Sequence, residues 1–316
     1  MKKTLIALAA VAVSSAAMAQ VTISGKYAVA YQKIETAAGK KSSGFNTTDG
    51  DIVFSGTEDI EGGMKAGASL ALRLRGRVAT AADSVNGRDA SVFLQGGFGR
   101  LTMGSVEAGN GIIGRASAGA PVIGQDGNVT LDGGTNVDMA SLSLPLATGL
   151  TATVMLIDSI GSPGTAGMEG HAATQDATLF GLAYAAGPIS VGFDSTSFGQ
   201  NAAAAATGTD SRMRVSASFN LGVAMVGAGY QTKETFTGVA DKQMMVGVSV
   251  PMGAITVGAT YAVRDNDVDT ADATGYELGA NYAFSKRTNL QTAYLSQSIN
   301  KGADATTLRV RLMHAF

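Results

Sequence analysis

The sequence contains arginines at alternate positions, and this residue type at this spacing could create positively charged surfaces. Arg73, Arg75 and Arg77 lie at every second position of one stretch, and Arg309 and Arg311 are spaced in the same way near the C-terminus. Side chains at every second position of a β-strand share one face, so each row would present its positive charge in one direction. Such a row stays ionised where water hydrates it. The spacing therefore predicts basic surfaces that face water.

Residues for covalent or metal chemistry are sparse. The two histidines, His171 and His314, lie in a polar segment and beside the C-terminal phenylalanine, and neither has a persuasive Ser or Asp partner. The acidic stretch 264–272 lacks the glycine and final glutamate of a calcium loop, and no H-x-x-x-H pattern occurs. The absence of cysteine excludes thiol chemistry and disulfides. We therefore expect no enzyme, no metal site and no cofactor.

One glycine motif is a false lead. GNGIIG at 109–114 matches the G-x-G-x-x-G pattern of dinucleotide-binding proteins. That pattern needs a following helix within a βαβ unit, whereas residues 116–135 are broken by glycines and Pro121. Glycine is so abundant here, at 42 residues, that a chance match is the better interpretation.

Alternation with a period of two recurs through the chain. In the stretch 21–31, apolar residues occupy Val21, Ile23, Tyr27, Val29 and Tyr31, with Lys26 and small residues between them. The stretches 64–77, 212–219 and 308–316 alternate in the same way, which favours strands with one apolar and one polar face. Only 15% of residues are charged, yet after the N-terminal segment no apolar run approaches a membrane helix in length. Together these features predict an all-β transmembrane barrel.

The N-terminal segment predicts export. Lys2 and Lys3 precede an apolar run from Leu5 to Val13, and an A-x-A-like site ends at Ala19. We expect residues 1–19 to be a signal peptide that is cleaved, and residues 20–316 to form the barrel. Removing Lys2 and Lys3 leaves 21 of the 23 basic residues against 25 acidic ones, a net charge of −4. This balance argues against a nucleic-acid partner.

Turn signals divide the barrel into strands. Seven tight turns are expected at 58–63, 96–99, 145–149, 185–188, 220–222, 251–253 and 284–286. Longer polar segments separate them, near 32–50, 76–89, 105–137, 158–176, 195–210, 231–242, 264–275 and 297–305. Seven turns and the meeting of the two chain ends predict sixteen antiparallel strands. An even number lets the first and last strands pair, whereas the alternative, an edge strand of a secreted sandwich, explains the alternation less well.

Several blocks of the chain carry a resemblance. The stretches VTISGKYAVAY (21–31), 54–73 and 94–105 and the final HAF are similar to those of the general trimeric porins of Gram-negative bacteria. The resemblance implies a sixteen-stranded barrel in the cell outer membrane, in contact with its lipid and lipopolysaccharide. It further implies a homotrimer, passive diffusion of small hydrophilic solutes and ions, and a third long loop that folds inward.

The resemblance also suggests where the pore narrows. It would make the segment 105–136 the constriction loop, with Glu107, Asp126 and Asp132 as candidate acids. These acids would face basic residues on the wall, with Arg73 and Arg75 first and Arg77 near the outer end of the strand. Further lumen charges are expected at Arg309, Arg311, Arg212, Arg214 and Lys26. The simpler alternatives are a surface loop with solvated carboxylates and arginines that only hydrate the inner wall.

The resulting expectation is a channel with mild anion preference, because arginines dominate the assigned lumen positions. A substrate-selective channel is the main alternative, although the segment 105–136 lacks the aromatic residues that stack on sugars. A barrel enzyme and a barrel that only anchors surface loops are less favoured. Conductance in a bilayer separates these classes.

Overall fold

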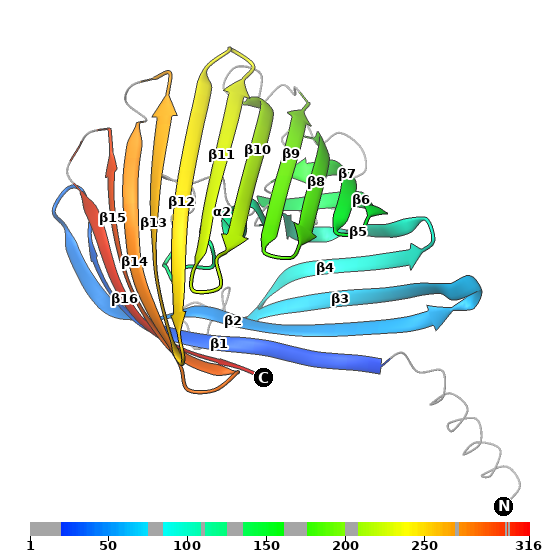
Figure 1. Ribbon diagram of the computed structural model, residues 1–316, viewed down its shortest axis with the longest axis horizontal. Coiled ribbons are helices and arrows are strands. Elements are labelled where there is room, and N and C mark those ends of the chain that lie inside the picture. Colours follow the sequence, from blue (N-terminus) through cyan, green and yellow to red (C-terminus); the bar gives the residue numbers. More distant parts are fainter. Residues whose placement is uncertain are drawn as a thin grey trace, which may run out of the picture.

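The chain forms a closed β-barrel. The computed structural model describes residues 20–74, 85–108, 111–124, 135–160, 176–199, 208–268, 272–300, 302 and 304–316. Within these ranges sixteen antiparallel strands follow one another round the barrel in sequence order (Figure 1). This confirms the predicted fold class and strand number.

The first eight strands are β1 (Gln20–Glu35), β2 (Lys41–Ile60), β3 (Met64–Leu74), β4 (Val85–Gly96), β5 (Gly99–Ala108), β6 (Thr135–Ala147), β7 (Leu150–Ile160) and β8 (Ala177–Ala186). The remaining strands are β9 (Ile189–Phe198), β10 (Thr209–Asn220), β11 (Met225–Thr235), β12 (Ala240–Met252), β13 (Ile255–Asn266), β14 (Ala273–Ala283), β15 (Thr288–Ile299) and β16 (Ala305–Ala315). Two short helices accompany them, the 3₁₀ turn η1 (Glu61–Gly63) and α2 (Gly111–Ala116). No helix in the described ranges is long and apolar enough to cross a membrane.

The two ends of the chain close the barrel. β1 pairs with β16 from Lys26 opposite Ala315 to Glu35 opposite Thr306. Beyond this ladder, Gly25 and Phe316 exchange both of their backbone hydrogen bonds, each at 3.0 Å. The C-terminal residue is therefore held in the sheet, and from Gly25 onward the first strand pairs with the last, so this stretch leaves no open edge to lipid.

The two faces of the strands carry different residues, as the alternation predicts. On β16, Leu308, Val310 and Leu312 are exposed on the outer face, and Arg309 between them is buried. On β10, Met213 and Val215 are exposed, whereas Arg214 and Ser216 are buried. An apolar outer face and a polar inner face are what a barrel needs when lipid surrounds it and water fills it.

The seven short turns lie where the sequence predicts them, but two of the expected long polar segments are mostly strand. Only residues 36–40 lie between β1 and β2, and only residues 236–239 lie between β11 and β12. The expectation for 32–50 and 231–242 was wrong because backbone pairing continues through polar side chains. Asn46 Nδ2, for example, donates across the ladder to Gln32 Oε1 at 3.2 Å.

The helix α2 packs against the barrel wall rather than standing apart from it. It contacts β9, β10, β11 and β12 (Figure 1). Ile112 and Ala116 on α2 are buried in one apolar cluster with Met245, Ala262 and Ala273. Met245 alternates along β12 with the exposed Met244 and Val246, so the cluster joins α2 to the face of the wall opposite to those two side chains.

Candidate pore-lining site

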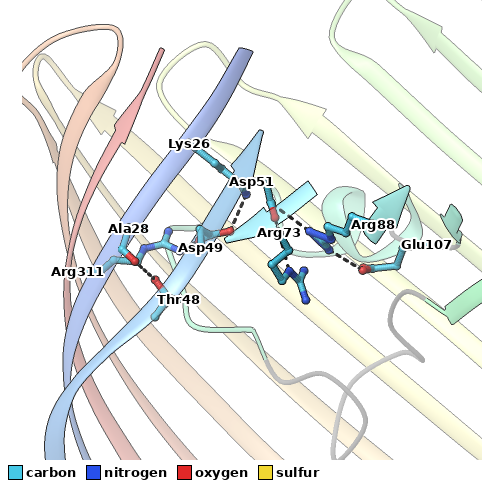
Figure 2. Close-up of polar contacts among 9 residues, drawn as sticks. All are labelled: Lys26, Ala28, Thr48, Asp49, Asp51, Arg73, Arg88, Glu107 and Arg311. Atoms are coloured by element: carbon cyan, nitrogen blue, oxygen red, sulfur yellow. Dashed lines mark hydrogen bonds and ion pairs between the residues drawn. The ribbon is translucent and has the colours of Figure 1, made fainter. Parts of the chain in front are cut away.

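Asp51 is the centre of an ionic cluster on the inner wall. It lies on β2 and is buried. Arg88 on β4 donates through Nη1 to Asp51 Oδ2 at 3.0 Å, and Arg73 Nε on β3 lies 3.5 Å from Oδ1 (Figure 2). Two guanidinium groups from neighbouring strands thus share one carboxylate.

Two further carboxylates, Asp49 and Glu107, lie on either side of these contacts. Asp49, also on β2, pairs with Lys26 Nζ on β1 at 2.7 Å and with Arg311 Nη1 on β16 at 3.0 Å. Glu107, near the end of β5, accepts from Arg88 Nη2 at 2.8 Å. We call Lys26, Arg73, Arg88 and Arg311 with Asp49, Asp51 and Glu107 the wall cluster. It comprises two sets of ion pairs, one around Asp49 on β1, β2 and β16 and one around Asp51 on β2 to β5, and both aspartates lie on β2 (Figure 2).

A β-bulge directs Arg88 to the lumen. The pairing of β3 with β4 shifts register between Leu70 opposite Ala90 and Leu72 opposite Gly87. Val85 and Val92 are both exposed, at 52% and 56%, although residues seven positions apart on a regular strand would point to opposite faces. Strict alternation would put Arg88 on the same outer face as Val92, and the extra residue resets it.

A second bulge lies beside Asp49. The pairing of β1 with β2 goes from Ala28 opposite Asp49 to Val29 opposite Thr47, so Thr48 is the extra residue. The hydroxyl of Thr48 donates to the backbone oxygen of Ala28 at 3.5 Å. Both bulges border the wall cluster, where they re-aim side chains that regular strands would point elsewhere.

The cluster presents more positive than negative charge to the lumen. Four cations meet three carboxylates, which leaves a net charge of +1. Coverage differs among the pairs: the side chain of Asp51 is 10% exposed against 31% for Arg73, and that of Asp49 is 19% exposed against 43% for Lys26, whereas Glu107 is 30% exposed against 24% for Arg88. The most exposed charges of the cluster are therefore the ammonium group of Lys26 and the guanidinium group of Arg73.

The segment 111–124 contacts a different part of the inner wall. Arg115 Nε donates to Ser216 Oγ on β10 at 2.9 Å, and Ser249 Oγ on β12 donates to the oxygen of Ala118 at 2.6 Å. Further along, the backbone N–H of Gly124 donates to Glu277 Oε1 on β14 at 3.1 Å. The segment is thus bonded to side chains of β10, β12 and β14.

The last strands hold the same segment at Val122. Its backbone oxygen accepts from Gln291 Nε2 on β15 at 3.3 Å and from Arg309 Nη2 on β16 at 3.2 Å. Arg309 Nη2 also donates to Gln291 Oε1 at 3.1 Å. Arg309 is therefore tied to this segment, whereas its neighbour in the row, Arg311, belongs to the wall cluster.

Two carboxylates on the inner face of β9–β13, Asp194 and Asp241, are almost closed to solvent by their basic partners. Arg214 Nε donates to both oxygens of Asp194, at 2.8 and 3.2 Å, and Arg214 is only 1% exposed. Asp241 on β12 accepts from Arg264 Nη2 at 2.6 Å, and Lys233 Nζ lies 3.9 Å away. These carboxylates are covered by their partners, so they add little negative charge to the surface that a solute meets.

The structure separates the predicted site residues into groups. Arg73, Arg311 and Glu107 join the wall cluster, and Arg309 holds the segment 111–124. Glu107 pairs with an arginine on its own side of the barrel, at the end of β5. The remaining candidates, Arg75, Arg77, Asp126 and Asp132, lie outside the described residues, as does His171. His314 accepts from or donates to Thr288 Oγ1 through Nδ1 at 2.9 Å.

Sequence reasoning missed three members of the wall cluster, Asp49, Asp51 and Arg88. Asp49 and Asp51 fall in or beside the stretch 32–50, which the sequence assigns to a polar segment, and Arg88 falls in the segment 76–89. The alternate spacing of the two aspartates was a usable signal, because it matches that of the arginines. Arg88 offered none, since only the bulge turns it inward.

A closed barrel with an apolar outer face and a charged inner wall is typical of the class of membrane channel barrels. The fold and this class point to a channel rather than an enzyme. The chain belongs to the Gram-negative porin family, whose sequence model matches residues 4–302. The resemblance noted in the sequence is thereby confirmed.

Individual relatives agree with this placement. The chain is 40% identical to the outer membrane porin protein 32 of Delftia acidovorans over 111 residues, which span 33% of this chain and only 31% of that relative. The anion-selective porin from Comamonas acidovorans has the same fold, with a TM-score of 0.71 and 24% identity over 95% of this chain and all of that one. A loop-deletion mutant of OmpT from Vibrio cholerae gives a TM-score of 0.68 and 12% identity over 94% of this chain and 99% of that one. A triple mutant of the Rhodopseudomonas blastica porin gives a TM-score of 0.66 and 16% identity over 94% of this chain and all of that one.

Proposed function

We propose that the chain forms a water-filled channel through which small hydrophilic solutes and ions diffuse passively across the outer membrane, with a mild preference for anions. The observation that carries this proposal is the wall cluster, in which four cations meet three carboxylates and the two most exposed charged side chains are Lys26 and Arg73. Fixed charge along a hydrated path raises the local concentration of ions of opposite sign. A related fold described as an anion-selective porin supports the sign of the preference.

The third long segment, 105–136, is proposed to fold into the lumen and to narrow it. Its described part contacts Ser216, Ser249, Glu277 and Arg309, which alternate with exposed apolar residues on their strands. The narrow part of the channel then lies between the residues 111–124 and the wall cluster. The width of this narrow part sets the size of the solutes that pass, and the cations of the wall cluster on one side of it set the charge preference.

The assembled state is proposed to be a homotrimer in contact with outer-membrane lipid and lipopolysaccharide. Related barrels support this, since the OmpT structure from Vibrio cholerae is described as a trimer form. Residues 1–19 are proposed to be a signal peptide removed on export, because the N-terminal charges, the apolar run and the A-x-A-like site all match one.

Conductance in a planar lipid bilayer tests the proposed function. The chain from Gln20 to Phe316, refolded in detergent and added to one side, should produce large ohmic steps. In a potassium chloride gradient the reversal potential should have the sign of a modest chloride preference. A bilayer that stays electrically tight would overturn the channel, and a clear potassium preference would overturn the selectivity alone.

A further inference from the structure

We propose that five inward-facing glycines on β9 and β11–β14 form a track that seats residues 115–121 and thereby sets the width of the channel. The members of this glycine track are Gly192, Gly227, Gly247, Gly258 and Gly279. The assignment rests on the proposed function, since it takes the segment 105–136 to be the narrowest part of the channel. The glycines act by positioning that segment and need not touch the solute.

The pairing of the strands brings the glycines into line. Gly227 lies directly opposite Gly247 in the pairing of β11 with β12, and Gly258 lies opposite Gly279 in that of β13 with β14. Gly192 on β9 lies opposite Ser216, the residue that binds Arg115. The residues that alternate with the glycines, such as Val226, Val246 and Leu278, are exposed on the outer face. The glycines therefore face the lumen.

The segment lies so close to the track that a methyl group would not fit. A Cβ at Gly227 would overlap the backbone oxygen of Arg115, and a Cβ at Gly279 would overlap that of Pro121. At Gly247 it would lie 2.5 Å from the carbonyl carbon and oxygen of Ser117. These obstacles are backbone atoms, which no side-chain rotation moves away, so even alanine would force the segment off the wall.

Two positions of the track, Gly258 and Gly192, are less strict. At Gly258 a Cβ would lie 2.7 Å from Ala120 Cβ and 2.8 Å from Pro121 Cδ. At Gly192 it would meet the guanidinium group of Arg115, which can move because it ends a long side chain. The close backbone contacts at Gly227, Gly247 and Gly279 are therefore the ones that decide whether the segment remains seated.

Polar side chains from the same strands complete the seat. Ser216, Ser249, Glu277, Gln291 and Arg309 bind the segment between Arg115 and Gly124. Glycine weakens the interior of a strand because it has no side chain to pack and loses more backbone entropy. Close approach of another backbone is a recognised reason for such a residue, and here it occurs on three strands, β11, β12 and β14.

One inward-facing glycine outside the track provides a matched control. Gly181 lies on β8, between Phe180 and Leu182, and a Cβ there would have its nearest neighbours at 3.6 Å. That distance is ordinary van der Waals contact, and the neighbours are Leu179 and Phe193 rather than the segment 115–121. Gly181→Ala therefore makes the same chemical change in a strand without touching the segment.

The test places a reporter in the segment itself. Ser117→Cys replaces a buried hydroxyl by a thiol of similar size, and the chain has no other cysteine. Gly247→Ala is then compared with Gly181→Ala in this background, in folded, detergent-solubilised protein treated with a small methanethiosulfonate reagent. We expect Gly247→Ala to speed labelling by about tenfold or more, as local opening exposes the thiol, and Gly181→Ala to leave the rate unchanged. Single-channel conductance should change in parallel for Gly247→Ala only.

The outcomes distinguish this inference from the proposed function. Equal labelling rates in the two variants would overturn the track, while ohmic steps from the parent protein would still support the channel. Absence of conductance in the parent would overturn the channel, and the labelling rates would still decide whether the glycines seat the segment. If Gly247→Ala does not fold, Gly227→Ala and Gly279→Ala make the same test from neighbouring strands. Failure of all three to fold, with Gly181→Ala folded, would show that the glycines serve barrel assembly and would contradict the proposal.

Discussion

Arg88 and Asp51 form an ion pair across an intervening strand. Nη1 of Arg88 on β4 lies 3.0 Å from Oδ2 of Asp51 on β2, although β3 separates the two strands. The other terminal nitrogen of Arg88 binds Glu107 on β5 at 2.8 Å. A single guanidinium group therefore links two carboxylates on opposite sides of it, and removing it changes both the charge and the connectivity of the wall cluster.

Arg88→Gln should weaken the preference for anions. The substitution removes one positive charge and leaves Asp51 and Glu107 without that partner. A unit charge about 7 Å from an ion in water is worth ~0.6 kcal/mol, which is roughly a threefold change in local anion concentration at low salt. The reversal potential in a potassium chloride gradient should accordingly move toward the potassium equilibrium value.

The matched control for Arg88→Gln is Lys41→Gln. Lys41 also pairs with a carboxylate, Glu35 at 3.3 Å, but it is exposed at the start of β2 and lies outside the wall cluster. Losing its charge should leave the reversal potential almost unchanged, because water screens it from the ion path. Equal shifts in the two variants would mean that total charge, and not the wall cluster, governs selectivity.

Asp51→Asn should have the opposite effect on selectivity. It removes a buried negative charge and leaves Arg73 and Arg88 in place, so the anion preference should increase. The same change replaces charge-assisted bonds by weaker ones, which should reduce the free energy of unfolding by about 1–3 kcal/mol. Reversal potentials measure the first effect and urea unfolding in detergent the second.

The double variant Arg88→Gln with Asp51→Asn checks this assignment. Its net charge equals that of the parent cluster, so its reversal potential should return close to the parent value. If the reversal potential of the double variant remained shifted toward the potassium value as far as that of Arg88→Gln alone, the arginine would act through geometry rather than through charge.

The strands and their two faces could be predicted because lipid imposes a strict rule. The outward positions of β16 are mostly apolar, which makes Leu308, Val310 and Leu312 readable from the sequence. The same rule put Arg309 and Arg311 on the face opposite to these residues, and Arg309 is buried there. It could not tell that Arg309 binds Val122 while Arg311 binds Asp49, because those partners are distant in the chain.

The wall cluster could be predicted only in part because two bulges interrupt the alternation. Counting in twos from the outward-facing Val92 puts Arg88 on the lipid face. The extra residue in β4 is set by pairing with β3, a tertiary contact that leaves no mark on local composition. The glycine track was equally hidden, because glycines that receive another segment look like any others in a chain with 42 of them.

Raising the salt concentration should reduce the anion preference without changing the protein. The Debye length falls from about 10 Å at 0.1 M to about 3 Å at 1 M, so the field of the wall charges reaches less far into the lumen. Reversal potentials at a constant concentration ratio but rising mean concentration should therefore approach zero. A preference that is independent of salt would point to direct anion binding at the arginines in place of a screened field.

The buried pair of Asp194 and Arg214 should matter far more for stability than a surface pair does. Asp194→Ala removes the carboxylate that accepts two bonds from Arg214 Nε, in a place where the arginine is 1% exposed. Breaking a buried pair by removing one partner costs about 3–5 kcal/mol. Asp59→Ala breaks the exposed pair with Lys65, whose atoms lie 2.8 Å apart, and should cost less than about 1 kcal/mol. Urea unfolding of both variants in detergent, followed by loss of β-structure in circular dichroism, measures the difference. Equal losses would show that water reaches the Asp194–Arg214 pair from the lumen and screens it as effectively as at the surface.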